Sequence, residues 1–145
     1  MRPCKNSGVS LIELMVGVAI AAIIAAIALP SYRDYVIRGK IPQATSNLAS
    51  LRAQLEQYYQ DNQTYVGACT NGTVAPLPPA DDFQYSCPTL SATAFTARAT
   101  GDASGPMNGF TYTIDQANTH ATTALPSGWG PTQSACWVTK KGGVC

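Results

Sequence analysis

The most regular pattern in the chain is an apolar run near its N-terminus, from Val9 to Leu29. There is no charged residue from Leu14 to Leu29, and Glu13 is the one charge inside the run. About 21 residues at about 1.5 Å each span roughly 30 Å as a helix, the thickness of the hydrocarbon core of a bilayer. Because the run is apolar on every side, it predicts a helix that is buried all round, as a transmembrane segment is.

A second pattern, with helical spacing, extends from Tyr32 to about Asp61. Apolar residues recur there at steps of three and four and mark one face of a helix: Ala44, Leu48, Leu51, Leu55 and Tyr58. The two patterns together predict one long helix of about 50 residues. Pro30 and Pro42 lie inside this helix, and each is expected to bend it or to remove a hydrogen bond.

Beyond the helix, the periodicity changes. Residues 62–92 are rich in turn-forming residues and are expected to form a loop. Apolar and polar residues then alternate in four predicted strands, which are 93–100, 109–116, 119–125 and 135–139. Phe110, Tyr112 and Ile114 would share one face of the sheet. The pattern predicts an α+β fold, in which the long N-terminal helix packs on a four-stranded antiparallel sheet.

Charge and cysteine content narrow the functional classes. Charged residues make up 12% of the chain and the formal net charge is +1, which gives no support to a general nucleic-acid-binding protein. Cys4 precedes the apolar run and four cysteines follow it: Cys69, Cys87, Cys136 and Cys145. An even set beyond a membrane segment indicates disulfides in an oxidising compartment. Three pairings are possible, and short separation favours Cys69 with Cys87 and Cys136 with Cys145.

Catalytic and metal-binding patterns are missing from the sequence. His120 is the single histidine and lies among threonines in a predicted hairpin, so no nucleophile–base pair is expected. There is no C-x-x-C pair for zinc, and the adjacent Asp81 and Asp82 lack the ligand spacing that calcium requires. We therefore expect no enzymatic activity, no cofactor and no metal.

The residues before the apolar run are basic. Arg2 and Lys5 should stay in the cytoplasm, which places the rest of the chain in the periplasm or outside the cell. A secretory signal peptide cut after Ala28 is the alternative, because residues 26–28 form an A-x-A-like site. The length of the run, and Pro30 two residues past that site, count against this alternative.

The stretch GVSLIELMV, residues 8–16, resembles the cleavage signal of type IV prepilins. It has a short basic leader, a glycine before the cut, an apolar residue after it, then serine, and glutamate at the fifth position. Pro30, Tyr32, Tyr35 and Arg38 fall where type IVa pilins carry Pro, Tyr, Tyr and Arg. Val9 departs from the usual Phe or Met, and Ala22 stands where many members have Gly. LEQYYQDNQTYVGAC and SACWVTKKGGVC are similar to the minor pilins called PilE and to the related ComP group.

This resemblance implies a division of the chain and a set of modified residues. Residues 1–8 would be a leader cut after Gly8, and Val9 would be N-methylated. Residues 9–30 would form the transmembrane and filament-core helix, and 31–145 the amphipathic helix and globular head of a pilin fold. In the family, the glutamate that corresponds to Glu13 neutralises the terminal amine of the neighbouring subunit and thereby fixes the axial register between the two subunits. The alternative for Glu13 is a carboxylate that snorkels to the membrane interface.

The function implied is that of a minor pilin, a structural subunit of a type IV pilus that supports pilus biogenesis, adhesion, twitching motility or DNA uptake. Its expected partners are other pilin subunits, prepilin peptidase and the inner-membrane assembly platform. It would reside in the inner membrane with its C-terminal domain in the periplasm, and in surface pili after assembly. One alternative is a ComP-like DNA-uptake receptor that contacts DNA through Lys140 and Lys141, which is not favoured because basic residues are few. Another is a signal-anchored periplasmic binding domain that never polymerises.

Overall fold

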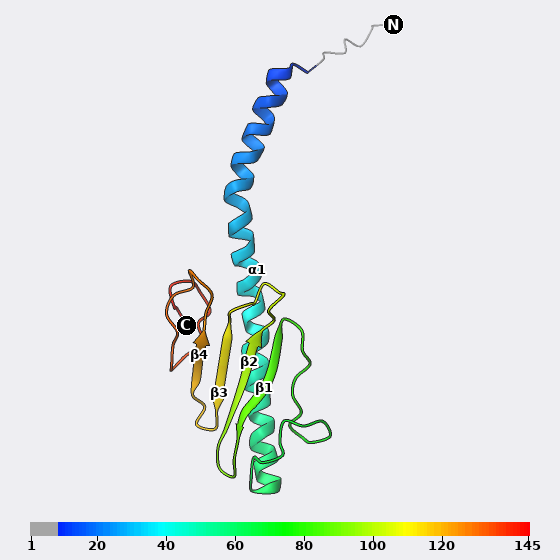
Figure 1. The fold of residues 1–145 in the computed structure, drawn as a ribbon, viewed down its shortest axis with the longest axis vertical. Coiled ribbons are helices and arrows are strands. Elements are labelled where there is room, and N and C mark those ends of the chain that lie inside the picture. The colour runs from blue at the N-terminus through cyan, green and yellow to red at the C-terminus, as the bar shows by residue number, and fades with distance from the viewer. Residues whose placement is uncertain (1–8) are drawn as a thin grey trace. The chain divides into compact units, whose positions relative to one another are not determined.

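The computed structural model describes residues 9–145, which form one helix and four strands (Figure 1). Helix α1 spans Leu11–Asn62, and the strands are β1 Phe83–Leu90, β2 Phe95–Gly101, β3 Thr111–Asp115 and β4 His120–Ala124. The chain divides into two compact units, one ending at Val36 and the other, the head unit, running from Ile37 to Cys145. Helix α1 contributes to both. The expected leader, residues 1–8 with Cys4 and Gly8, lies outside the described residues.

Helix α1 confirms the prediction of one long helix, with 52 residues. It passes through Pro30 and Pro42 without a break in helical structure, and the bends expected at these prolines stay predictions. The helix ends where Gln63 adopts a left-handed conformation, with φ of 57°. The backbone N–H of Gln63 closes the last turn by donating to the carbonyl of Tyr59 at 2.7 Å, a common way for a helix to end.

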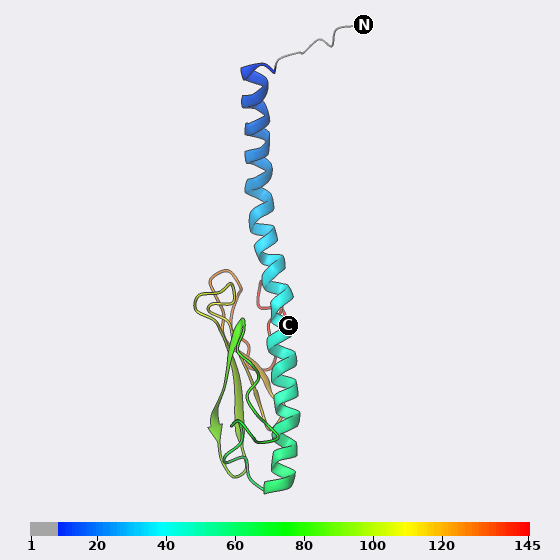
Figure 2. The same cartoon turned by 90° about the vertical axis from the view of Figure 1, so that its right-hand side faces the viewer.

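The predicted apolar stripe of the second half of α1 is confirmed as the helical side of the core. Ala44, Leu48, Leu51 and Leu55 are fully buried, Ile41 extends the stripe at 1% exposure, and Tyr58 at its other end is only partly buried. They lie in one core with the inner face of the sheet, whose buried residues are Phe83, Phe95, Ala97, Ala99, Phe110, Tyr112 and Ile114. From Ile37 onward, helix and sheet therefore form two layers around one hydrophobic core (Figure 2).

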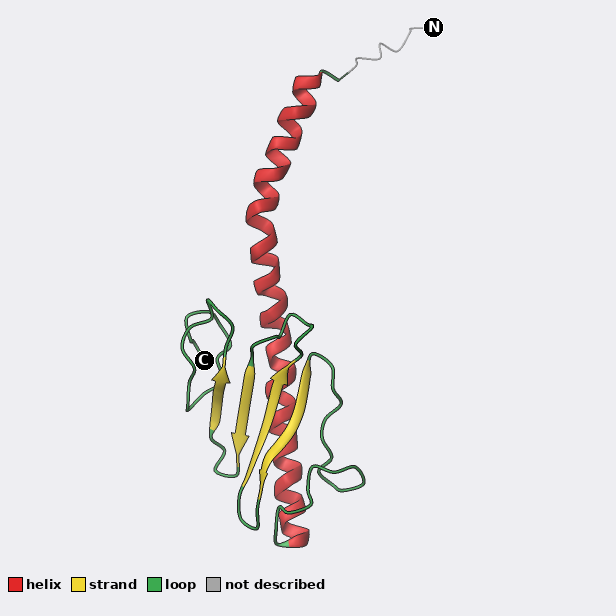
Figure 3. Cartoon of the chain, in the orientation of Figure 1, coloured by secondary structure: helices red, strands yellow, loops and turns green. Residues whose placement is uncertain are grey.

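The sheet is an antiparallel meander in the order β1-β2-β3-β4 (Figure 3). The predicted α+β fold and the number of strands are confirmed. Three predicted strands correspond to β2, β3 and β4. Tyr112 pairs with Ala99 and Thr122, and Ile114 pairs with Ala97 and His120, so alternate residues of these strands face the helix.

Two sequence predictions about strands are wrong. Residues 62–92 do not form a loop throughout, because β1 occupies Phe83–Leu90. Its alternation fails near Pro88, where the pairing with β2 shifts between Ser86 and Thr89. A proline can lie there because β1 is an edge strand and one of its sides needs no ladder.

The second error concerns 135–139, which is irregular although it alternates. The Thr122 hydroxyl accepts a hydrogen bond from the N–H of Val138 at 2.9 Å and donates one to the carbonyl of Cys136 at 3.0 Å. This segment is therefore held by a side chain of β4 instead of a backbone ladder. Val138 is buried, which explains the alternation that suggested a strand.

Candidate functional site

The apolar segment, Leu11–Leu29, has no partner within the described chain. Every residue from Val9 to Leu29 is exposed, with Leu11 at 78% and Ile27 at 72%. By length and composition this part of α1 could cross a membrane, with a mean hydropathy of 2.6 in its most apolar window. A continuous apolar surface of this extent requires cover by lipid or by other proteins.

Glu13 lies in the first turn of α1. Ser10 directly precedes the helix, and its carbonyl accepts a hydrogen bond from the N–H of Leu14 at 3.2 Å. The spacing of Ser10 and Glu13 is that of a capping box, a signal that the sequence analysis missed. A carboxylate there lies near the positive end of the helix dipole, about one turn from Val9. Gly8, the other half of the expected cleavage site, is outside the described residues.

Small residues form a ladder along the apolar segment. Gly17, Ala21 and Ala25 are four residues apart, so they share one face of α1, and all three are exposed. A Cβ atom added to Gly17 would meet nothing within 4 Å. The ladder therefore remains open to the close approach of another helix, as small residues at this spacing allow.

Three polar contacts in the head unit join α1 to β1 and to the two residues before it. The Lys40 ammonium binds the Asp82 carboxylate, and their side chains are 33% and 14% exposed. The Gln43 amide donates to Asp81 at 3.3 Å. The next contact along the helix is made by the Asn47 amide, which donates to the Tyr85 hydroxyl at 2.9 Å. The two aspartates considered at first for calcium therefore contact helix side chains.

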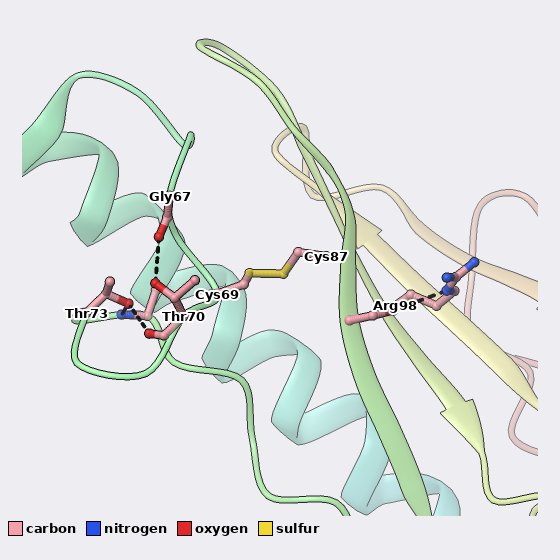
Figure 4. The surroundings of a disulfide bond; sticks show 8 residues. Gly67, Cys69, Thr70, Thr73, Cys87 and Arg98 are labelled. Carbon is pink, nitrogen blue, oxygen red and sulfur yellow. Dashed lines mark hydrogen bonds between the residues drawn. A yellow bond between two sulfur atoms is a disulfide. The ribbon is translucent and has the colours of Figure 1, made fainter.

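The first disulfide loop, Cys69–Cys87, fastens the segment after α1 to the middle of β1 (Figure 4). The two Cα atoms are 6.4 Å apart. Within the loop, the Thr70 hydroxyl donates to the carbonyl of Gly67 and the Thr73 hydroxyl to that of Thr70, both at 2.8 Å. These bonds replace the regular secondary structure that this part of the chain lacks.

The C-terminal loop, Cys136–Cys145, carries the two lysines considered for DNA. Its disulfide joins Cα atoms 5.9 Å apart. The backbone N–H groups of Thr139 and Lys140 both donate to the carbonyl of Val144, at 2.8 and 3.1 Å. Lys140 and Lys141 are exposed on the turn that these bonds close. The structure therefore presents both lysines on one short, cross-linked turn.

The C-terminal loop is also fixed from outside, by contacts that the sequence did not suggest. The N–H of Gly143 donates to the carbonyl of Trp129 at 2.8 Å. The Trp137 indole donates to the carbonyl of Thr113 at 2.9 Å and stacks on His120, with ring centroids 4.0 Å apart. His120, which the sequence placed in a predicted hairpin, is partly buried by this stacking.

Comparisons with known proteins match both parts of the chain. Residues 30–136 match the family described as type IV minor pilin ComP, DNA uptake sequence receptor, and residues 3–29 match the prokaryotic N-terminal methylation motif. The chain is 44% identical to fimbrial protein EcpC of Eikenella corrodens over 56 residues. This match covers 39% of this chain and 37% of EcpC. It is 35% identical over 98 residues to type IV major fimbrial protein FimA of Dichelobacter nodosus, covering 68% and 58% of the two chains.

A solved structure supports the fold. The minor pilin PilV of Neisseria meningitidis superposes with a TM-score of 0.56 at 17% identity, over 71% of this chain and 96% of that one. The matches to EcpC and FimA span less than two thirds of either relative. The ComP match, in contrast, extends over more than half of this chain, from Pro30 to Cys136. The chain therefore belongs to the type IV pilins, in the family of the minor pilin ComP.

Proposed function

We propose that this chain is a structural subunit of a type IV pilus, made as a membrane-anchored precursor. The observation that carries the proposal is the contrast between the two units. The head unit buries its own apolar core, whereas the apolar segment is exposed along its whole length. Lipid would cover this segment before assembly, and the helices of other pilin subunits would cover it in the filament.

Processing would create the assembly-competent N-terminus. Prepilin peptidase would cut after Gly8 and methylate the amine of Val9, in keeping with the match of residues 3–29 to the N-terminal methylation motif. The precursor would lie in the inner membrane with the head unit in the periplasm. The assembly platform and other pilin subunits, of the same or other kinds, would then take it into surface pili that serve adhesion, twitching motility or DNA uptake.

Glu13 would fix the axial register of the subunit. A buried carboxylate is tolerated when a cation lies beside it, and the methylated amine of a neighbouring subunit would be that cation. A subunit docked out of register would leave both charges without partners in apolar surroundings. The position of Glu13 in the first turn of an exposed apolar helix supports this role.

The mass of the mature protein tests the proposal. Pili sheared from cells should contain this chain with N-methylated Val9 as its first residue, and Gly8→Val should leave an uncut precursor in the membrane fraction. A mature chain that starts at Leu29 would instead identify a secretory signal peptide and remove the assembly helix. A chain that keeps its helix but never enters pili would support the anchored, non-polymerising alternative.

A second candidate function is that of a DNA-uptake receptor. The observation that favours it is the ComP match over residues 30–136, together with Lys140 and Lys141 on one cross-linked turn. Two lysines are a small electrostatic footprint, so we expect weak binding to double-stranded DNA. Titration at low salt, with Lys140→Glu plus Lys141→Glu as the variant and Arg98→Glu as the control, decides between the two. Submicromolar binding that only the lysine variant abolishes would establish the receptor function.

A further inference from the structure

Two tyrosines and an arginine lie where the apolar segment of α1 ends. Tyr32 is 67% exposed and Tyr35 is 75% exposed, and Arg33 between them is exposed as well. Within residues 9–145, Arg33 makes no hydrogen bond or ion pair, whereas the adjacent Asp34 has an interaction of its own. These three residues, named here the interface group, form an exposed aromatic and cationic group on α1.

The interface group lies at a defined distance from the apolar segment. At about 1.5 Å per residue, Leu11–Leu29 spans roughly 28 Å, close to the hydrocarbon thickness of about 30 Å. Arg33 is then about 6 Å beyond Leu29 along the helix axis, and Tyr35 about 9 Å. The headgroup layer adds about 5–8 Å on each side of a bilayer. When the apolar segment fills the membrane, Tyr32 and Arg33 lie at the depth of the headgroups and Tyr35 lies at their outer edge.

The chemistry of the group also fits this layer. A hollow of about 390 Å³ beside Arg33 has Ala26 and Leu29 on its apolar side and Arg33 and Asp34 on its charged side. An amphipathic ligand satisfies both sides, with a hydrocarbon chain against the alanine and leucine and an anion against the guanidinium. Exposed tyrosines are favoured at the same level, because their rings are apolar and their hydroxyls are polar.

We infer that Tyr32, Arg33 and Tyr35 form a binding site for the phosphate headgroups of anionic phospholipids in the periplasmic leaflet. This inference rests on the proposed membrane-anchored precursor. The guanidinium pairs with lipid phosphate, and the two tyrosine rings fix the depth of the helix. Withdrawal of the subunit from the membrane breaks these contacts, so the site contributes to the barrier that the assembly machinery must overcome.

Lipid selection by the full chain tests the site. The protein is reconstituted into nanodiscs of phosphatidylcholine mixed with phosphatidylglycerol, and the lipids that remain bound after mild detergent extraction are quantified by mass spectrometry. A basic residue at an anionic surface contributes about 1 kcal/mol, so the wild type should retain phosphatidylglycerol about 5-fold over its share of the bilayer. Arg33→Gln should lose this enrichment, and Arg98→Gln, the same change on the head unit, should keep it.

The possible outcomes distinguish a failure of the lipid site from a failure of the proposed membrane-anchored precursor. If the wild type inserts but retains the two lipids in proportion to the bilayer, or if Arg33→Gln keeps the enrichment, the lipid site is wrong and the membrane anchor stands. If Arg98→Gln loses the enrichment equally, the effect is one of total charge and the site is wrong. If the chain does not enter nanodiscs at all, the anchored precursor and the lipid site both fail.

Discussion

The hydroxyl of Tyr112 donates a hydrogen bond to the backbone carbonyl of Val138 at 2.9 Å, across 26 residues of sequence. Both groups are buried, and the bond ties the C-terminal segment to β3. Burial raises the pKa of Tyr112 well above the ordinary value for a tyrosine. This contact therefore links the stability of the head unit to pH.

Tyr112→Phe should lower the free energy of unfolding at neutral pH by about 1 kcal/mol, because the carbonyl of Val138 loses its buried donor. In the wild type, the folded pKa of Tyr112 lies above the unfolded value of about 10, so folding retains a proton that the unfolded chain releases. The free energy of unfolding should therefore fall as the pH rises above about 10, and it should fall less steeply in Tyr112→Phe.

Urea unfolding of the full chain in detergent, followed by circular dichroism at neutral and alkaline pH, measures both effects. Tyr35→Phe is the matched control, since Tyr35 is exposed and should behave as wild type. Burial also raises the pKa of Tyr65 and Tyr85, so some alkaline sensitivity should remain in the variant. An unchanged alkaline slope in Tyr112→Phe would contradict this account of its buried hydroxyl.

Lys40→Gln should destabilise the head unit, because Asp82 would keep a largely buried carboxylate without its cation. A partly exposed pair of this kind is expected to contribute about 1 kcal/mol. Arg98→Gln removes a cation from an exposed position on β2 and should change the unfolding free energy by less than about 0.5 kcal/mol. Equal effects of the two changes in a urea titration would show that Lys40–Asp82 does not stabilise the fold.

Gly130→Ala should disrupt the packing of the C-terminal loop more than Gly128→Ala does. Both glycines have left-handed backbones, with φ of 100° and 85°, so alanine costs about 1 kcal/mol at either position. A Cβ at Gly130 would lie 2.4 Å from the backbone N of Gly143, whereas one at Gly128 would meet nothing within 4 Å. The midpoint of thermal unfolding should therefore be clearly lower for Gly130→Ala than for Gly128→Ala. Equal midpoints would mean that the loop can move away at little cost.

Replacement of Cys136 and Cys145 by serine should lower the unfolding free energy by about 3 kcal/mol, the value of the chain-entropy model for a short loop. The core between α1 and the sheet should remain folded, because the loop lies beside β4 (Figure 1) and contributes Val138 alone to the buried residues of that core. Hydrogen exchange should show lost protection in residues 129–145 alone. Loss of protection throughout β1 and β2 would contradict this separation.

The sequence predicted the elements whose side chains repeat with a clear period. The stripe from Ala44 to Leu55 and the alternation of Phe110, Tyr112 and Ile114 gave the correct faces, because one side of each element is buried. Strand β1 could not be found in this way. Its edge position admits Pro88 and a change of register, and both interrupt the period of two.

The irregular parts depend on contacts between residues far apart in sequence. The strand predicted over residues 135–139 was wrong because Thr122, on β4, supplies the hydrogen bonds that a neighbouring strand would supply. The stacking of His120 on Trp137 depends on the same docking. In the N-terminal part, the motif around Glu13 could be read from the sequence alone, because it is one short, continuous stretch, residues 8–16.

The incorporation of Glu13→Gln into pili tests the central claim most directly. The change should leave membrane insertion intact, since the segment becomes more apolar. Docking should fail, because the terminal amine of a neighbouring subunit would be buried without a counter-charge. A loss on the order of 2–4 kcal/mol corresponds to a drop in incorporation of roughly 30- to 1,000-fold.

The measurement is the ratio of this subunit to total pilin in sheared filaments, from cells that express equal amounts of wild type, Glu13→Gln or the control Asp61→Asn. Asp61 is exposed at the C-terminal end of α1, so its variant should enter pili as the wild type does. We expect mature Glu13→Gln protein to accumulate in the inner membrane and to be nearly absent from filaments. Filaments that contain Glu13→Gln at the wild-type ratio would contradict the claim that this charge fixes the subunit in the pilus.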